Sequence, residues 1–176
     1  MGGGEVRPGA NRFRASPVNE RPYESSDLPG VMGTYTAAIR TLAAPDYTPE
    51  QIAVWAPVPP DAARWEERMA RLHTFVAESD GVLAGFTSYT QEGYLDFLFT
   101  HPAFARRGVA SRLYQRVESA LHTAGTPCVT TRASLVSRLF FERHGFQLDG
   151  EERIECRGVW LRWFAMHKPL RMERSA

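Results

Sequence analysis

The feature that most constrains the fold of this chain is a buried strand joined by a short loop to an amphipathic helix. Residues Tyr94–Thr100 are apolar apart from Asp96 and the terminal threonine and predict a strand, and residues 108–123 have the apolar spacing of a helix. The loop between them is basic and contains Gly108. A strand that passes directly into a helix favours a domain in which helices pack on a sheet.

The rest of the chain repeats this alternation. Asp80-Gly81 predicts a hairpin turn, because a two-residue turn requires positive φ angles. Thr48 before Pro49 predicts a capped helix start. We expect further strands near Arg21 and over residues 74–78, 82–90, 128–132, from 146 onward and over 158–167, and helices after Asp27 and over residues 61–72 and 134–144. This order predicts an α/β fold with a mixed sheet and helices on both faces.

The chain of 176 residues suits one domain. Residues 1–17 are rich in Gly, Arg and Pro without hydrophobic periodicity and predict a flexible extension. The folded domain is expected over residues 18–170, followed by a short tail over 171–176.

Composition argues against several classes of partner. A net charge of +1 provides no general attraction for nucleic acid or a membrane surface. No apolar run approaches the roughly 20 residues of a membrane span, and no secretory signal is visible, so a cytoplasmic protein is expected. Cys128 and Cys156 are far apart and lack a nearby Cys or His at ligand spacing, so no metal site is expected.

The loop before the helix predicts a site for phosphate. The first amides of a helix have no intrahelical partners and lie at the positive end of its dipole. Gly108 and Ala110 keep this turn open, because larger side chains would stand between the amides and a ligand. The alternative is an ordinary strand-to-helix connection with solvated arginines.

Two segments together resemble the GCN5-related N-acetyltransferase (GNAT) family. Residues 95–113 resemble its acyl-CoA signature, and residues 132–146, which end in Gly145-Phe146, resemble its second signature. The resemblance covers most of the chain. It implies the GNAT-like acyl-CoA N-acyltransferase fold, with a splayed central mixed sheet flanked by helices. It also implies an enzyme that transfers an acetyl group from acetyl-CoA to a primary amine of a small molecule or an exposed amino group.

The resemblance implies which residues bind acetyl-CoA. The pyrophosphate would lie on the backbone amides of residues 105–110, and the pantetheine would pair with the strand edge at residues 98–100. The implied cofactor contacts are Leu98, Phe99, Thr100, Ala105, Arg106, Arg107, Gly108, Val109, Ala110, Ser111, Ser134 and Phe141. Arg112 would add positive charge near the phosphates.

Two positions depart from the family pattern. Ala105 stands where the family commonly has Arg or Gln, which removes a side-chain contact but leaves the backbone amides. Phe141 stands where many members have a Tyr whose hydroxyl protonates the departing thiolate. A thiol has a reference pKa of about 8.5, so loss of this acid is expected to slow the reaction without abolishing it.

Candidate catalytic residues follow from the missing tyrosine. Asp96 is a carboxylate in an otherwise apolar strand and is a candidate general base, with a structural hydrogen-bonding role as the alternative. Ser134 falls where the family often has an Asn contacting CoA, and Ser137 follows one helical turn later. Either serine could hold a water that replaces the tyrosine, although helix surfaces often carry serines.

The amine acceptor is expected to contact the region after the first strand, by resemblance to a bacterial subgroup of the family with Phe-Phe before the Gly-Phe turn. Tyr47, Glu50 and Trp55 are the candidates, the acid for a cationic amine and the rings for stacking, with a core role as the alternative for Trp55. The apolar stretch 159–166 would favour a homodimer if its edge were exposed.

Two other functions are compatible with the residues. An acyl-CoA sensor or regulator could retain the phosphate loop without catalysis, as Ala105 and Phe141 suggest. An unrelated nucleotide-binding domain is disfavoured, because the loop lacks the Lys-Ser/Thr of a P-loop and the three glycines of a dinucleotide fold.

Overall fold

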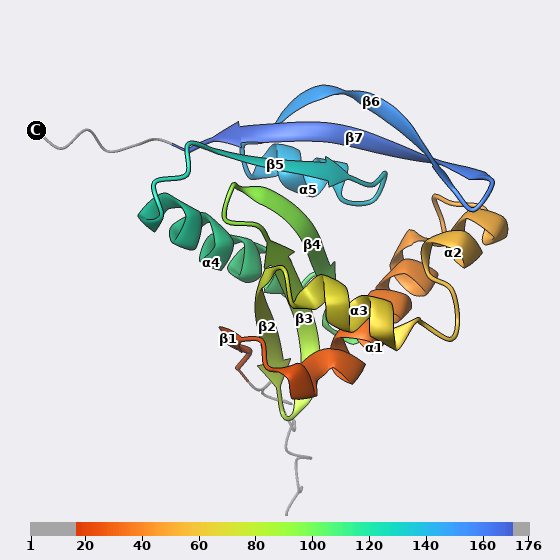
Figure 1. The fold of residues 1–176 in the computed structure, drawn as a ribbon, viewed down its shortest axis with the longest axis horizontal. Coiled ribbons are helices and arrows are strands. Elements are labelled where there is room, and N and C mark those ends of the chain that lie inside the picture. The colour runs from red at the N-terminus through yellow and green to blue at the C-terminus, as the bar shows by residue number, and fades with distance from the viewer. Residues whose placement is uncertain (1–16, 171–176) are drawn as a thin grey trace, which may run out of the picture.

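The computed structural model describes residues 17–170 (Figure 1). The expected N-terminal extension, apart from Pro17, and the C-terminal tail over 171–176 lie outside the described residues. The strands are β1 (Asn19–Pro22), β2 (His73–Ser79), β3 (Val82–Tyr89), β4 (Tyr94–Thr100), β5 (Cys128–Ala133), β6 (Gln147–Cys156) and β7 (Val159–Pro169). The α-helices are α1 (Leu28–Ala38), α2 (Pro49–Trp55), α3 (Ala62–Met69), α4 (Val109–Thr123) and α5 (Arg138–Arg143). Short 3-10 turns span Ser25–Asp27 and Pro102–Phe104, and a π-helical turn spans Ile39–Ala43.

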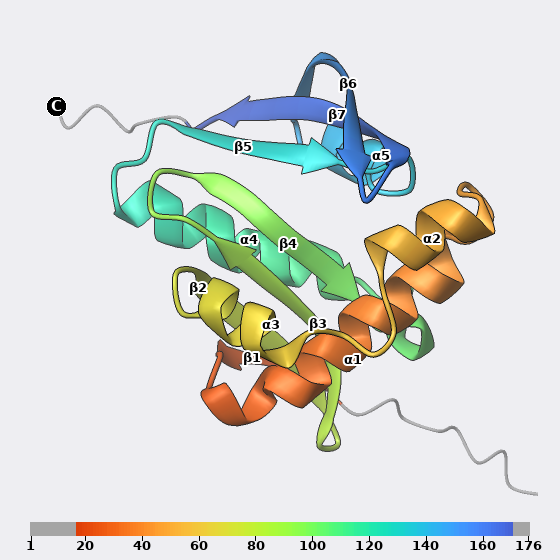
Figure 2. The same ribbon diagram turned by 45° about the vertical axis from the view of Figure 1, so that its right-hand side comes forward.

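The described strands form one seven-stranded mixed sheet in the order β1-β2-β3-β4-β5-β7-β6. All neighbours are antiparallel except β4 and β5, which are parallel and connected through α4. Helices cover both faces of the sheet (Figures 1 and 2). The expected α/β fold with a mixed sheet is therefore confirmed.

Two apolar layers hold the helices on the sheet. On one face, Leu28 and Val31 of α1 and Met69 of α3 pack against Val76 and Phe86. On the other face, the apolar stripe of α4 packs against the sheet, with Leu113, Tyr114 and Val117 fully buried. Gly85 of β3 permits the close approach of α4, because a Cβ there would lie 2.9 Å from Val109 Cγ1 and 2.7 Å from the carbonyl oxygen of Phe99.

Local sequence signals are confirmed where they concern turns and caps. Asp80 and Gly81 form the two-residue turn between β2 and β3 with φ angles of 51° and 73°. Thr48 caps α2: its hydroxyl accepts a hydrogen bond from the Gln51 amide, and the Gln51 side chain accepts one from the Thr48 amide.

One expected helix differs from the structure, and the homodimer expectation is not decided by it. The helix expected over residues 134–144 begins only at Arg138, because Ser134 and Ser137 bond to each other's backbone amides and form a turn first. Strand β7 lies between β5 and β6, but β5 pairs with it only from Phe164 onward, so residues 159–163 are paired with β6 alone and the homodimer stays a prediction.

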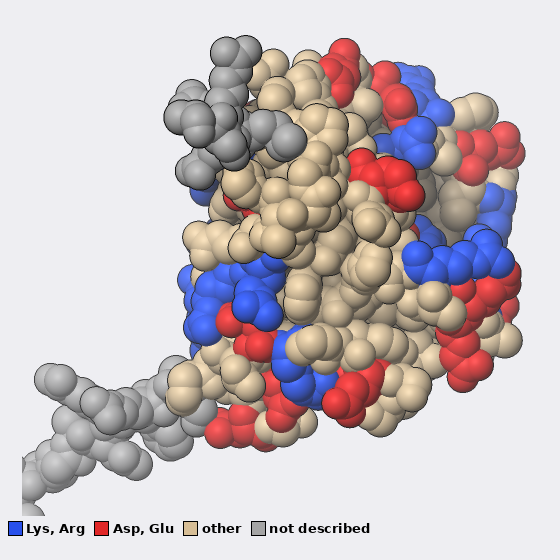
Figure 3. Space-filling view, turned by 60° about the vertical axis from the view of Figure 1, so that its left-hand side comes forward, with Lys and Arg blue, Asp and Glu red and all other residues tan. Residues whose placement is uncertain are grey.

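Charged side chains of both signs are interspersed on the face shown in Figure 3. Within residues 17–170, no helix has the length and apolar character to cross a membrane. The same residues contain no group of three or more His, Cys, Asp or Glu side chains placed to hold a metal ion.

Candidate active site

A cavity of about 580 Å³ lies where the sheet opens between β4 and β5. Strands β4, β5 and β7, helix α5 and the β6–β7 hairpin line it from the side of the sheet, and α1, α2 and α3 line it from the other side. Figures 1 and 2 show β4 and β5 diverging toward the ends that face these helices. The cavity therefore depends on the separation of two neighbouring strands.

The two strands pair only at their beginnings, Tyr94 with Thr130 and Leu95 with Thr131. The Thr131 hydroxyl donates to the carbonyl oxygen of Leu95 at 2.9 Å and closes the paired part. Beyond this point β5 remains paired with β7 through Ala133, and β4 follows β3. From residue 96 onward, β4 has no strand on the side of the gap.

The register of β3 and β4 shows which backbone groups face the gap. The His101 amide donates to the carbonyl of Ala84, so Thr100 and Gly85 form a pair that exchanges no hydrogen bonds. By alternation, the N–H and C=O groups of Leu98 and Thr100 face the gap, while those of Phe99 face β3. Two of the three strand residues expected to pair with a ligand thus present their backbones to it, and Phe99 lines the cavity with its side chain.

The loop from β4 to α4 presents amides at one end of the cavity. Arg106 and Gly108 have positive φ angles of 62° and 79°, and Gly108 is the N-cap of α4 without a side-chain hydrogen bond. A Cβ at Gly108 would meet no atom within 4 Å, so the space beside the first turn of α4 is open. Ala110 in this turn lines the cavity. Arg106 and Arg107 are exposed and, within the described residues, form no ion pair.

Arg112 is bound elsewhere. Its Nε lies 2.5 Å from Glu20 Oε1, and its Nη2 donates to the carbonyl of Val18 at 2.7 Å. The guanidinium thus fastens α4 to the start of β1. Its expected contribution near the phosphates is therefore reduced, because its charge is balanced by a carboxylate.

Ser111 and His144 form a link that the sequence did not reveal. His144 Nδ1 lies 2.8 Å from the carbonyl oxygen of Phe140 and therefore donates to it, and Nε2 lies 3.1 Å from the Ser111 hydroxyl. The imidazole ring also stacks on Phe140 at 4.0 Å. The pair connects the first turn of α4 to the end of α5 and thereby positions the two helices that bound this end of the cavity.

Ser134 and Ser137 both line the cavity and share one hydrogen-bond pair. Their hydroxyls lie 3.0 Å apart, and each hydroxyl accepts from the other residue's amide at 2.9 and 3.2 Å. This reciprocal arrangement begins the turn that leads into α5. Helix capping alone accounts for both serines, and a catalytic function for either stays a prediction.

Asp96 lines the cavity and is held by Arg68 of α3. Arg68 Nη2 donates to Oδ1 at 2.7 Å and Nε donates to Oδ2 at 3.0 Å, so both carboxylate oxygens are engaged. The guanidinium also lies 4.3 Å from the centroid of the Phe97 ring. This ion pair is the structural alternative to a general base at Asp96, and the function as a base stays a prediction.

Known proteins similar to this chain decide its family. The sequence model of the acetyltransferase (GNAT) domain matches residues 43–170, most of the chain. This chain belongs to the GNAT acetyltransferase family. It is therefore an acyltransferase, as the two signatures predicted.

Individual relatives agree with GNAT membership. The N-acetyltransferase YafP of Escherichia coli (strain K12) is 37% identical over 156 residues, which span 86% of this chain and 97% of that protein. A GCN5-related N-acetyltransferase from Rhodopseudomonas palustris superposes with a TM-score of 0.84 at 29% identity, covering 89% of this chain and 98% of that one. The PaiA N-acetyltransferase of Thermoplasma acidophilum, solved with coenzyme A, has a TM-score of 0.70 over 87% of this chain and 99% of that one; at 16% identity it supports the fold alone.

For a GNAT enzyme, the residue at the tyrosine position is Phe141. Its ring is 3% exposed, lines the cavity and packs against Phe146 at a centroid distance of 5.0 Å. Phenylalanine has no proton to give, so the acid that this position provides in many GNAT members is absent from this side chain.

Of the three acceptor residues predicted for this GNAT enzyme, the structure brings only Trp55 to the cavity, where it meets Trp163 at a centroid distance of 5.1 Å. Tyr47 is not in the cavity lining; it is buried in the core, and its hydroxyl accepts from the Leu135 amide at 3.0 Å. Glu50 lies exposed on α2 and is also absent from the lining.

Several residues of the GNAT cavity were missed from the sequence. Tyr94 of β4 lines it beside Arg132, and burial, followed by the charge of Asp96, raises the pKa of the Tyr94 phenol. Other missed lining residues are Tyr35, Arg64, Trp65, Arg68, Arg157 and Trp163. The available signal was the placement of Trp65 and Arg68 three residues apart on one helix, which puts both side chains on the same face.

Proposed function

We propose that this GNAT enzyme transfers the acetyl group of acetyl-CoA to a primary amine that enters the cavity. One observation carries the proposal: the cavity joins a free strand edge and an open helix N-terminus to a separate wall of side chains. The solved GNAT relatives include yncA of Salmonella typhimurium with its cofactor acetyl-CoA, which supports acetyl-CoA as the co-substrate here.

The residues present fit coenzyme A. The free amide and carbonyl groups of Leu98 and Thr100 suit the amide groups of a pantetheine arm, which can pair with a strand edge as another strand would. The open space beside Gly108 and the unpaired first-turn amides of α4 suit a pyrophosphate. We propose Arg106 and Arg107 as further phosphate contacts, because both cations are exposed next to these amides.

The reaction requires a neutral amine, a polarised thioester carbonyl and a proton for the departing sulfur. Acetyl-CoA supplies an activated thioester. An amine must approach it as the neutral base, so its N–C bond can form while the C–S bond breaks. The amine nitrogen loses one proton and the thiolate sulfur gains one, so the number of protons is conserved. We propose that a β4 amide facing the gap at Leu98 polarises the carbonyl, as an oxyanion hole does.

The proton donor for the sulfur is proposed to be a water held at Ser134 and Ser137. Both hydroxyls line the cavity on the same side as Phe141, where the usual phenol is missing. A thiolate is a tolerable leaving group, so a water is sufficient for turnover. We propose that the reaction takes place in the cytoplasm, where a coenzyme A thioester would be available.

A panel of small primary amines tests the proposal. The enzyme should release free coenzyme A from acetyl-CoA only when an amine is present, and mass spectrometry should find one acetylated amine per thiol released. If acetyl-CoA binds but no amine in the panel causes release, the chain is an acyl-CoA sensor. Phe141 is the observation that favours this alternative.

A further inference from the structure

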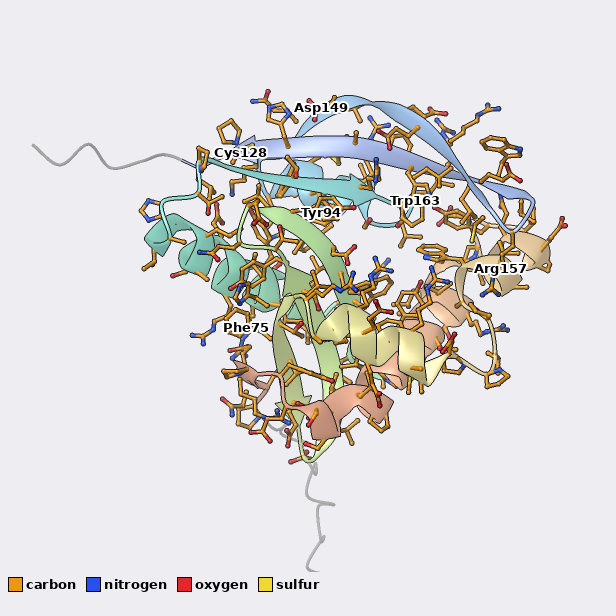
Figure 4. All side chains as sticks on the ribbon, viewed as in Figure 1. Phe75, Tyr94, Cys128, Asp149, Arg157 and Trp163 are labelled. Carbon is orange, nitrogen blue, oxygen red and sulfur yellow. The ribbon has the colours of Figure 1, made fainter. Side chains whose placement is uncertain are left out.

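The acceptor side of the cavity combines aromatic rings with arginines. What we infer from it about the acceptor rests on the proposed function. Tyr35, Trp55, Trp65, Tyr94 and Trp163 all line the cavity. Tyr35 meets Trp65 at 4.9 Å and Trp55 meets Trp163 at 5.1 Å, both edge to face. Figure 4 shows Tyr94 on β4 and Trp163 on β7 at the strands that border the opening. Walls of this kind suit a flat, apolar body.

Arg68 has hydrogen-bond donors left after its ion pair with Asp96. Asp96 uses Nε and one hydrogen of Nη2, whereas a guanidinium has five N–H groups. Within residues 17–170, no acceptor is recorded for Nη1, and the side chain is 49% exposed. A second carboxylate could therefore be bound by the Nη1–Nη2 fork while Asp96 and the Phe97 ring hold the guanidinium in place.

Two further arginines line the same cavity with uncommitted guanidinium groups. Arg64 precedes Arg68 by one helical turn on α3, and Arg157 lies at the tip of the β6–β7 hairpin near α2 (Figure 4). Neither side chain forms an ion pair or a hydrogen bond with another described residue. Arg64 and Arg68 also border a second hollow of about 370 Å³ along α3, next to Arg71. Arg64 and Arg68 thus lie together where α3 meets the cavity.

The carboxylates in the lining equal these three arginines in number but leave many of their N–H donors without an acceptor. Both oxygens of Asp96 accept from Arg68, and Asp61 Oδ1 accepts from the Arg64 amide as the N-cap of α3. Glu155 is the remaining acidic residue of the lining. Arg64, Arg68 and Arg157 therefore keep N–H donors that no described side chain accepts, and these donors are available to an anion.

We propose that the acceptor is an amine with an aromatic body and a carboxylate group, as in an aromatic amino acid. The rings of the wall hold the body, and the guanidinium groups of Arg64, Arg68 and Arg157 bind the carboxylate. An acceptor of this class matches both the aromatic rings and the free N–H donors of this wall.

Matched amines that differ only in the carboxylate test this proposal. Calorimetry on the protein saturated with CoA should compare tryptophan with tryptamine and phenylalanine with phenethylamine. We expect the carboxylate-bearing member of at least one pair to bind about tenfold more tightly or better, and this preference should weaken with added salt. In the variants Arg64→Gln and Arg157→Gln, the ratio of the affinity for the carboxylate-bearing amine to the affinity for its decarboxylated partner should fall toward one. Arg71→Gln is the matched control on α3, because Arg71 pairs with Glu67 outside this cavity, and it should keep the preference.

Three results would overturn the proposal: equal or tighter binding of the decarboxylated amines, no binding of any of the four compounds, or a preference that survives both substitutions. The proposed function is judged separately, by acetyl-CoA binding and by CoA release with the unselected amine panel. If acetyl-CoA fails to bind, the four compounds are measured on the protein without CoA, and the same comparison still decides the acceptor class.

Discussion

At the scale of single residues, Gly108 is the residue on which cofactor binding should depend most. It caps α4 in the left-handed region with φ of 79°, and open space lies where a Cβ would project. We expect Gly108→Ala to weaken acetyl-CoA binding about tenfold, or ~1.4 kcal/mol, in calorimetry, because the methyl group enters the space for the phosphates.

Gly81 provides the control for this change. It has φ of 73°, and a Cβ there would also meet no atom within 4 Å, but it lies in the β2–β3 turn. Gly81→Ala should cost a similar ~1 kcal/mol of backbone strain and leave acetyl-CoA affinity unchanged. If Gly108→Ala and Gly81→Ala bind acetyl-CoA with equal affinity, the loop at Gly108 does not bind the phosphates.

Phe141 offers a test by gain of function. Phe141→Tyr places a phenol at the position where many GNAT enzymes have their acid, and we expect kcat to rise by about threefold to tenfold. This is less than the 10²–10⁴ typical of general acids, because a thiolate leaves readily. Phe140→Tyr, on the neighbouring ring of the cavity wall, is the control and should give no increase. If the folded Phe141→Tyr enzyme has an unchanged kcat, thiolate protonation does not limit the reaction.

A substitution at Asp96 can distinguish its two candidate functions, general base and ion-pair partner of Arg68. If its main task is to hold Arg68, Asp96→Asn should raise the KM for the acceptor more than it lowers kcat, because the guanidinium loses its fixed position. This is the result we expect from steady-state kinetics across pH. A kcat reduced by two orders of magnitude or more, together with loss of the acidic limb of the pH profile, would instead assign the general base to Asp96.

At the scale of elements, the turn before α5 depends on its two serines. Ser137→Ala removes one half of the reciprocal cap with Ser134 and should cost about 1 kcal/mol of unfolding free energy. For a chain of this size, that corresponds to a melting temperature lower by about 2–4 °C in calorimetry.

An exposed serine on α4 provides the comparison for this cap. Ser119→Ala should change neither stability nor rate, because Ser119 is exposed and its recorded bond uses the backbone carbonyl. If Ser137→Ala leaves the melting temperature unchanged and lowers kcat more than tenfold, the hydroxyl acts in catalysis and the capping explanation fails.

Some features of the helices and turns could be predicted from the sequence, and others could not. The turn at Asp80-Gly81 and the cap at Thr48 were correct, because both depend on backbone conformations set by a few neighbouring residues. The late start of α5 was missed, because Ser134 and Ser137 have the composition of either a helix face or a cap. Only the hydrogen-bond partners distinguish the two.

The cavity wall could not be predicted for a different reason. Arg68 and Asp96 lie 28 positions apart, and Tyr35, Trp65 and Trp163 come from α1, α3 and β7. Their meeting depends on how the helices pack over the sheet, which residue spacing does not encode. The burial of Tyr47 could not be predicted for the same reason: it packs in the core, where its hydroxyl accepts from the Leu135 amide. The succession of β4, loop and α4 was predictable because its residues are contiguous, and phosphate binding by the loop stays a prediction.

At the scale of the whole molecule, buried phenols set an alkaline limit to stability. Burial is the main cause that raises the pKa of Tyr35, Tyr47 and Tyr114 above the ordinary value of 10.0. Each folded phenol therefore keeps its proton at a pH where the unfolded one has lost it. Their contribution to stability is complete below about pH 10 and falls as pH rises further toward the folded pKa values.

Urea denaturation at several alkaline pH values checks this limit. The midpoint should decline above about pH 10, and the absorbance of the buried phenolates should rise together with the loss of near-ultraviolet circular dichroism. If the absorbance of all six tyrosines rises near pH 10 while the circular dichroism signal persists, these phenols are accessible in the folded state.

Acetyl-CoA is proposed to enter where β4 and β5 separate. A crystal structure of the acetyl-CoA complex tests it most directly. We predict the pyrophosphate on the amides of the loop and first turn around Gly108, the pantetheine paired with Leu98 and Thr100, and the acetyl group directed into the cavity toward Tyr94 and Asp96. Coenzyme A bound at another surface, with the gap between β4 and β5 left to solvent, would contradict the account.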